Sequence, residues 1–74
     1  MSLIDQIRAK AQKVEKVNGI TEYFTVSPPI RLRSIFSDQI FHVMQLDLIN
    51  ENHPLLYMAE TKSWYSAGSF KIDE

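Results

Sequence analysis

The hydrophobic pattern changes its period at Asn18-Gly19, and this change constrains the fold more than any other feature of the sequence. Before this point, apolar residues recur at the spacing of one helix face: Leu3, Ile4, Ile7, Ala11 and Val14. After it the period is closer to two, and β-branched and aromatic residues predominate, which is typical of strands. One helix followed by strands predicts an α+β domain.

The first segment carries the signals of a helix over about residues 2–18. Ser2 and Asp5 have the spacing of a capping box in its Asp variant, and the carboxylate also interacts favourably with the helix dipole. Lys13 and Lys16 lie near the expected end, where cations are favoured. Asn18-Gly19 supplies residues able to adopt the left-handed conformation that ends a helix.

Turn-forming residues divide the remainder into five predicted strands, at about 20–26, 30–35, 40–49, 55–60 and 64–72, the last interrupted near Gly68. Pro28-Pro29 is expected to end the first strand, because proline cannot donate to a sheet ladder. The connections are short enough for an antiparallel meander of four to five strands. We therefore expect a single small domain over residues 1–74, with the helix packed on one face of the sheet.

The small size of the chain leaves two options, which are tight packing of its own core or association with another chain. It has 74 residues and no cysteine, so it cannot use disulfides to stabilise a small core. The strand over 40–49 would be apolar on both faces, with Ile40, Met44, Leu46 and Leu48 on one and Phe41, Val43 and Ile49 on the other. The helix covers only one face of a sheet. A second copy or another partner is therefore expected to cover the other face, and a homodimer is the prediction.

Catalytic signatures are missing from the sequence. It has only two glycines, no phosphate-binding loop and no thiol, and its two histidines make a poor zinc site. His42 is expected to be a structural histidine, since no partner for it can be named. We predict a protein that is not an enzyme and uses no metal or cofactor. No apolar run is long enough to cross a membrane, so a cytoplasmic location is expected.

Gln45-Leu46-Asp47-Leu48-Ile49 is the most specific local motif. It resembles the pentapeptide with which bacterial proteins bind the replicative DNA sliding clamp, which reads Gln, Leu, Ser or Asp, Leu and Phe. Four of the five positions match, and the fifth is apolar but not aromatic. The resemblance implies that Gln45 hydrogen-bonds at the rim of a clamp pocket, near Asp47. Leu48 and Ile49 would then fill the pocket, with Leu46 as a flanking contact.

The same residues also alternate as a half-buried strand requires, which would place both leucines in the core. The sequence therefore supports two interpretations of the motif, a clamp-binding peptide and a half-buried strand of the core.

Charge is distributed unevenly around a net value of −1. Residues 1–33 carry six cations and three anions, whereas residues 34–74 carry two cations and six anions. Small size, the motif and an acidic C-terminal half together resemble phage-encoded inhibitors of the host sliding clamp. The resemblance implies occlusion of the clamp to block host DNA replication, in the bacterial cytoplasm. Acidic residues would face the basic clamp channel, and the candidates are Asp38, Glu51, Glu60, Asp73 and Glu74.

A single-stranded nucleic-acid binder is the alternative. It would stack bases on exposed aromatic rings near Arg31 and Arg33, the candidate rings being Tyr23, Phe24, Tyr57, Trp64 and Tyr65. Residues 53–70 resemble the strand-and-turn pattern of filamentous-phage single-strand binding proteins. The net charge argues against a basic binding face, so direct nucleic-acid binding is not expected. A regulatory subunit with an undisclosed partner is a third possibility.

Overall fold

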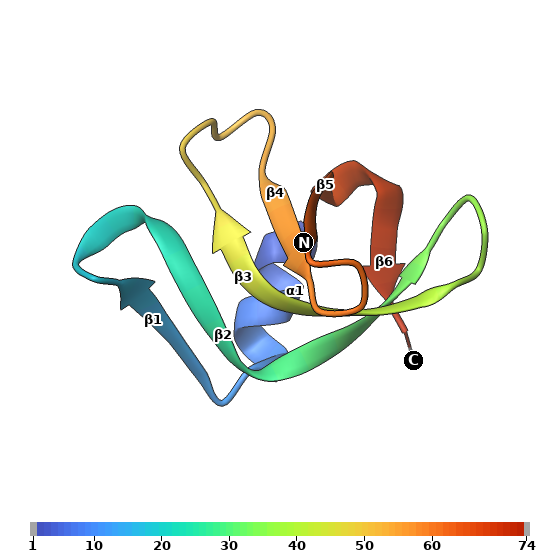
Figure 1. Cartoon of the computed structure of the whole chain (residues 1–74), viewed down its shortest axis with the longest axis horizontal. Helices are drawn as coiled ribbons and strands as arrows, with labels where there is room; N and C mark the ends of the chain where they lie inside the picture. The colour runs from blue at the N-terminus through green and yellow to red at the C-terminus, as the bar shows by residue number, and fades with distance from the viewer. Residues whose placement is uncertain (1, 74) are drawn as a thin grey trace.

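One helix and six strands follow one another along residues 2–73, the part of the chain that the computed structural model describes (Figure 1). They are α1 (Leu3–Lys10), β1 (Lys13–Val17), β2 (Ile20–Ser34), β3 (Ile40–Asp47), β4 (Leu55–Met58), β5 (Ser63–Ser66) and β6 (Phe70–Ile72), with a short 3-10 helix, η1 (Ala67–Ser69), before β6. The sheet order is β1-β2-β3-β4-β5, and β6 pairs with β2. The predicted α+β class and antiparallel meander are confirmed.

The helix α1 is shorter than the sequence predicts. Its start is as expected, because the Ser2 hydroxyl accepts a hydrogen bond from the Asp5 backbone N–H (3.3 Å) and donates one to the Asp5 carboxylate (3.0 Å). It ends at Lys10, and Ala11 is already extended. The predicted helix over 2–18 is therefore wrong in its second half, where the chain forms β1 instead.

The turn at Asn18-Gly19 explains that error. Both residues have positive φ, 50° for Asn18 and 78° for Gly19, which is the backbone of a two-residue hairpin turn rather than of a helix end. Val17 and Ile20 are paired across it, and further along Val14 pairs with Val26. A helix and a strand therefore both account for an inward-facing Val14, and the Asn-Gly hairpin decides between them.

The strand β2 combines two predicted strands into one. Its pairing with β3 breaks between Thr25 and Ile30, where Pro28-Pro29 cannot donate, but the chain stays extended through this segment. The first half of β2 pairs with β1 and the second half with β6. As the alternation predicts, Ile30 and Leu32 are buried in that second half.

The strand β3 contains a bulge at Met44, which corrects the prediction of two apolar faces. Val43 pairs with Met58 and Gln45 with Tyr57, so Met44 is an extra residue that changes the phase of the alternation. Phe41, Val43 and Leu46, which strict alternation assigns to opposite faces, are consequently all buried. The homodimer prediction thereby loses the observation of a second apolar face, and the small size of the chain still supports it.

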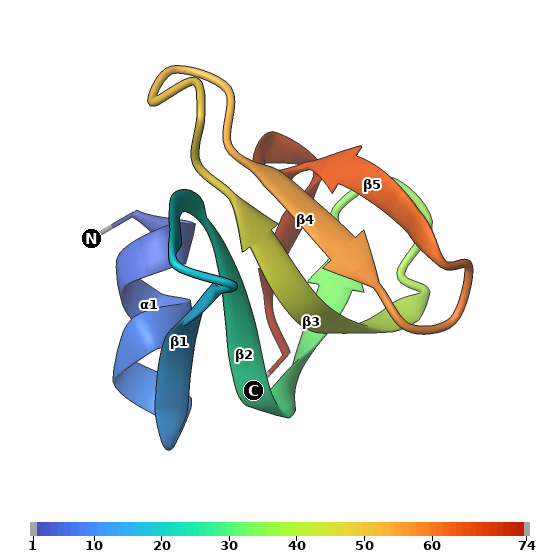
Figure 2. The ribbon, with the colours of Figure 1, turned by 60° about the vertical axis from the view of Figure 1, so that its left-hand side comes forward.

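The core lies between α1 and the inner face of the sheet. Ile7 of α1 is completely buried, and α1 contacts β2 and β6. Figure 2 shows α1 on one side of the molecule and the strands β4 and β5 on the other. The buried hydrophobic residues are Ile7, Val26, Ile30, Leu32, Phe41, Val43, Leu46, Leu56, Met58, Ala67 and Phe70. The opposite face of β4 and β5 is thus turned away from the helix.

The bounds of the later strands differ slightly from prediction. β3 ends at Asp47 rather than at 49, β4 ends at Met58 rather than at 60, and η1 divides the predicted strand over 64–72 at the expected interruption near Gly68. No helix within residues 2–73 has the length and apolar character needed to cross a membrane.

Candidate protein-interaction site

The clamp-like motif lies at the end of β3 and in the first residues of the β3–β4 loop. Leu46 is completely buried, whereas Leu48 is half-buried and packs against the core. Ile49 is 59% exposed. Gln45 and Asp47 are half-buried. The part of the motif within β3 thus has one buried face, on which Leu46 lies. Of the two residues proposed to fill the clamp pocket, Leu48 and Ile49, only Ile49 is exposed.

Two hydrogen bonds fix the end of the motif. The Leu48 backbone N–H donates to the Glu22 carbonyl (2.8 Å), which continues the pairing with β2 beyond the last residue of β3. The Asp47 carboxylate accepts from the Ile49 backbone N–H (3.0 Å). An Asp that caps the backbone two residues ahead forms an Asx turn. This turn is where the chain leaves the sheet and directs Ile49 into solvent.

Three aromatic rings gather on the outer face of the sheet beside the motif. Trp64 is 38% exposed, and its ring contacts those of Tyr57 and Tyr23 edge to face, with centroids 5.2 and 6.3 Å apart. Gln45 pairs with Tyr57, and Tyr57 pairs with Trp64. We call this surface the outer aromatic face, made of Tyr23, Gln45, Asp47, Tyr57 and Trp64.

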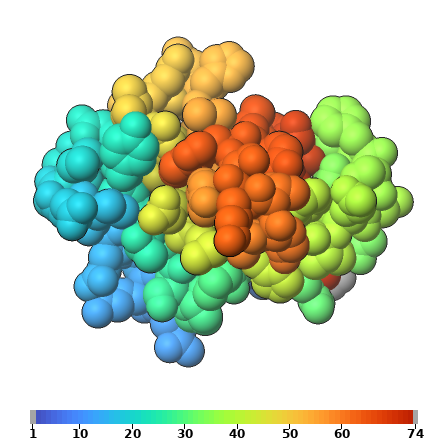
Figure 3. Space-filling view, viewed as in Figure 1, coloured from blue at the N-terminus to red at the C-terminus, as the bar shows by residue number. Residues whose placement is uncertain are grey.

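Figure 3 shows the side of the molecule turned away from α1, with β4 and β5 (orange to red) at its centre. Aromatic rings packed edge to face hold one another in place, because each restricts the rotation of its neighbours. The relative positions of the three rings are therefore set before a partner binds.

The other two candidate aromatic residues belong to the core side. Tyr65 contacts Phe41 and Phe70, each with ring centroids 5.8 Å apart. Phe24 is half-buried against the core, and the Arg8 guanidinium lies over its ring at 5.5 Å. The five rings proposed for base stacking are therefore divided between two faces.

Arg31 and Arg33 share one carboxylate, that of Asp73. Arg31 Nε lies 2.6 Å from Asp73 Oδ2, and Arg33 donates from two nitrogens to Asp73 Oδ1 at 2.8 and 3.0 Å. The hydrogen bonds from Arg33 and the charges of both guanidinium groups outweigh desolvation and hold the pKa of Asp73 below its ordinary value of 3.8. Both arginines are engaged by an anion, which weakens their use as phosphate contacts.

The proposed acidic surface is not gathered in one place. Asp38 and Glu51 are exposed, but they lie in the β2–β3 and β3–β4 loops, which project in different directions in Figure 1. The Asp73 side chain is only 7% exposed, because it is covered in its ion pairs. Glu74 lies outside the described residues.

His42 has a partner that the sequence does not reveal. Glu60 Oε1 accepts a hydrogen bond from the His42 backbone N–H (2.7 Å), and Glu60 Oε2 contacts the His42 ring at Nδ1. Desolvation alone would raise the pKa of Glu60, but the hydrogen bonds from His42 outweigh it and lower this pKa below 4.5. The residues are 18 positions apart, and only the β3–β4 register brings them together.

Within residues 2–73, no three acidic, histidine or cysteine side chains come together in a way that would hold a metal ion. Comparison of the chain with models of protein families, with curated proteins and with solved structures finds no match.

Proposed function

We propose that this protein is a non-catalytic protein-interaction module and that the outer aromatic face is its contact surface. The observation that carries this proposal is the position of Trp64, partly exposed between two tyrosines on the sheet face opposite α1. Tryptophan and tyrosine bury a large area with few freely rotating bonds, and they dominate the energetics of many interfaces. The Gln45 amide and the Asp47 carboxylate add polar groups within the same face.

The partner we propose is the sliding clamp of bacterial DNA replication, which the motif indicates. Gln45, Asp47 and Ile49 are the members of the motif available for contact on or beside the outer aromatic face. Ile49 would enter the clamp pocket first, because it already points into solvent. Leu48 could follow only if its hydrogen bond to the Glu22 carbonyl opened. Leu46 would stay in the core throughout, which differs from the way an unfolded peptide binds.

Such binding would occupy the site that polymerase and clamp-loader peptides use, and it would block replication by competition. The dispersed acidic residues support this proposal less than the motif does. The homodimer also remains a proposal.

The test is competition with a fluorescently labelled clamp-binding peptide on purified clamp, measured by anisotropy at moderate salt. The protein should displace the peptide at micromolar concentrations. Ile49→Ala and Trp64→Ala should each weaken displacement about tenfold or more, as expected for residues central to an interface. Ile20→Ala is the matched control, because Ile20 is 43% exposed and alternation places it on the opposite face of β2 from Tyr23.

Circular dichroism must show that each variant is folded. No displacement by the parent protein would refute the clamp as partner. Displacement that neither Ile49→Ala nor Trp64→Ala weakens would refute the assignment of the contact surface.

A further inference from the structure

Within residues 2–73, the most exposed large apolar side chain is that of Phe36, which is 81% exposed in the β2–β3 loop. The loop around it is ordered by hydrogen bonds. The buried Ser34 hydroxyl accepts from the backbone N–H groups of Phe36 (3.2 Å) and Ser37 (3.4 Å), and the Ser34 carbonyl accepts from the Asp38 N–H (3.1 Å). The backbone that carries the Phe36 ring is thus held in place, so little backbone entropy would be lost if the ring were buried in an interface.

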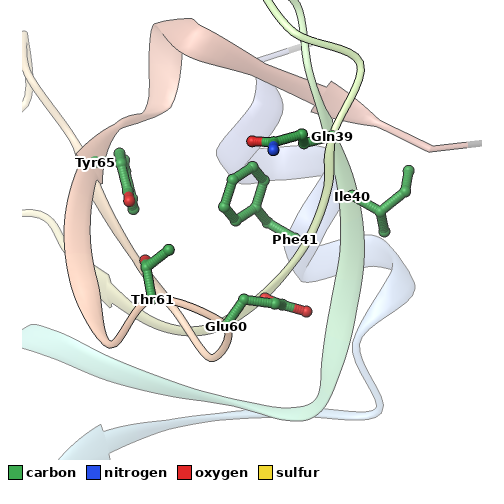
Figure 4. A pocket seen from close by; sticks show the side chains of 6 residues that line it. All are labelled: Gln39, Ile40, Phe41, Glu60, Thr61 and Tyr65. Carbon is green, nitrogen blue, oxygen red and sulfur yellow. The ribbon is translucent and has the colours of Figure 1, made fainter.

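A hollow lies directly beside this loop (Figure 4). It has a volume of about 400 Å³ and is lined by Gln39, Ile40, Phe41, Glu60, Thr61 and Tyr65. An apolar cavity of about 150 Å³ is already enough to bind benzene, so this hollow has room for a phenyl ring. Phe36 does not fill the hollow of its own chain, since its side chain is exposed to solvent.

We propose that this projection and this hollow form the interface of a homodimer, in which Phe36 of each copy enters the hollow of the other. A two-fold interface requires that both complementary features lie on one patch of the surface. The structure meets this requirement, because Gln39 belongs both to the loop that carries Phe36 and to the lining of the hollow. Phe41 and Tyr65, whose rings are 5.8 Å apart, would supply aromatic contacts to the incoming ring.

Charge is also complementary between the two features. Asp38 lies two residues beyond Phe36, and Lys62 follows Thr61 at the margin of the hollow. Both side chains are exposed. Exchange of the two loops about a two-fold axis would bring each Asp38 towards the Lys62 of the other copy. Glu60, which also lines the hollow, already contacts His42, so it does not present an unaccompanied anion to the incoming loop. None of the five residues that define the outer aromatic face lines the hollow, so this proposal does not rest on that face.

Sedimentation velocity over a range of protein concentrations tests the proposal. The parent protein should change from monomer to dimer as its concentration rises. Phe36→Asp should raise the dimer dissociation constant at least about thirty-fold, because it removes the ring that contacts Phe41 and Tyr65 and places a carboxylate beside Glu60. Ile20→Asp is the matched control, since it puts the same charge on another exposed apolar residue, and its dimer should persist. Circular dichroism of both variants establishes that they are folded.

A double-mutant cycle tests the charge pairing. Asp38→Asn and Lys62→Gln should each raise the dissociation constant about two- to five-fold, and the double variant should raise it by no more than one of them alone. Asn is chosen because residue 38 has a φ of 58°, which asparagine adopts readily. A parent protein that stays monomeric, an oligomer larger than a dimer, or a dimer unaffected by Phe36→Asp would overturn the proposal. Additive charge effects would overturn the pairing.

Discussion

Leu46→Ala and Ile49→Ala should separate the two roles that one short motif combines. Leu46 is completely buried and pairs with Phe24 on one side and Leu56 on the other, so its removal leaves a cavity in the middle of the core. Ile49 belongs to the same motif but is 59% exposed. The first substitution should destabilise the fold, and the second should act on binding alone.

The expected magnitudes differ widely. Truncation of a fully buried leucine costs about 2–5 kcal/mol, whereas an exposed substitution usually changes stability by less than about 0.5 kcal/mol. A core in a domain of this size supplies only about 3–5 kcal/mol, so Leu46→Ala should bring the protein close to its unfolding midpoint even without denaturant. Leu46→Val removes one methylene and should cost about 1 kcal/mol, which leaves a transition that can be measured.

Urea unfolding followed by circular dichroism and by Trp64 fluorescence is the assay. Leu46→Val should lower the urea midpoint by about 0.5–1 M, and Ile49→Ala should leave it nearly unchanged. In the clamp competition experiment, Ile49→Ala should lose affinity while it stays folded. Equal destabilisation by Ile49→Ala and Leu46→Ala would refute the division of the motif into a core residue and a contact residue.

Three further predictions concern stability. The lowered pKa of Asp73 stabilises the fold fully above the ordinary carboxyl pKa of 3.8, and this contribution is lost as the pH falls through the pKa of the folded state. The difference in free energy of unfolding between the parent protein and Asp73→Asn should therefore shrink on acidification, as measured by urea titrations at several pH values. Glu60→Gln should also lower the free energy of unfolding above the carboxyl pKa and not below it. The loss should be less than about 1 kcal/mol near pH 6, because the pair with His42 is partly exposed, and it should vanish at pH 2. An equal loss at both pH values would show that the charge of Glu60 does not contribute to stability. Ser34→Ala should lower the free energy of unfolding by about 1 kcal/mol and weaken dimerisation, because the loop N–H groups lose their acceptor, and an unchanged urea midpoint would contradict this account.

Much of the fold could be predicted from the sequence because local signals and tertiary packing agree in most segments. The helix start at Ser2, the alternation at Ile30 and Leu32, and the break near Gly68 all depend on nearby residues, and the structure confirms them. The predicted end of the helix was wrong because Val14 satisfies both the helical and the strand pattern. The Asn-Gly pair was the available signal, since it favours a two-residue hairpin turn.

The candidate site was less predictable because it depends on register. A bulge at Met44 changes which side chains of β3 are buried, and nothing in the alternation of the sequence marks it. The edge-to-face contact between Tyr23 and Trp64 joins residues 41 positions apart in the chain, and the ion pair of Arg33 with Asp73 spans 40. Sequence patterns give residue types and local periods, but such pairs require knowledge of which strands are neighbours.

The strand β2 pairs both with β1, near the start of the described chain, and with β6, the last strand described, and this has a consequence for biosynthesis. Leu32 and Ser34 pair with Ile72 and Phe70 of β6, the last strand described. While the chain emerges from the ribosome, the hairpin of β1 and β2 can form early, but the second half of β2 keeps an unpaired edge on the side of β6 until the final strand arrives. An open edge is a template for strand addition by another nascent chain. A chain truncated before Phe70 should therefore aggregate during expression, even though β1 to β5 are intact.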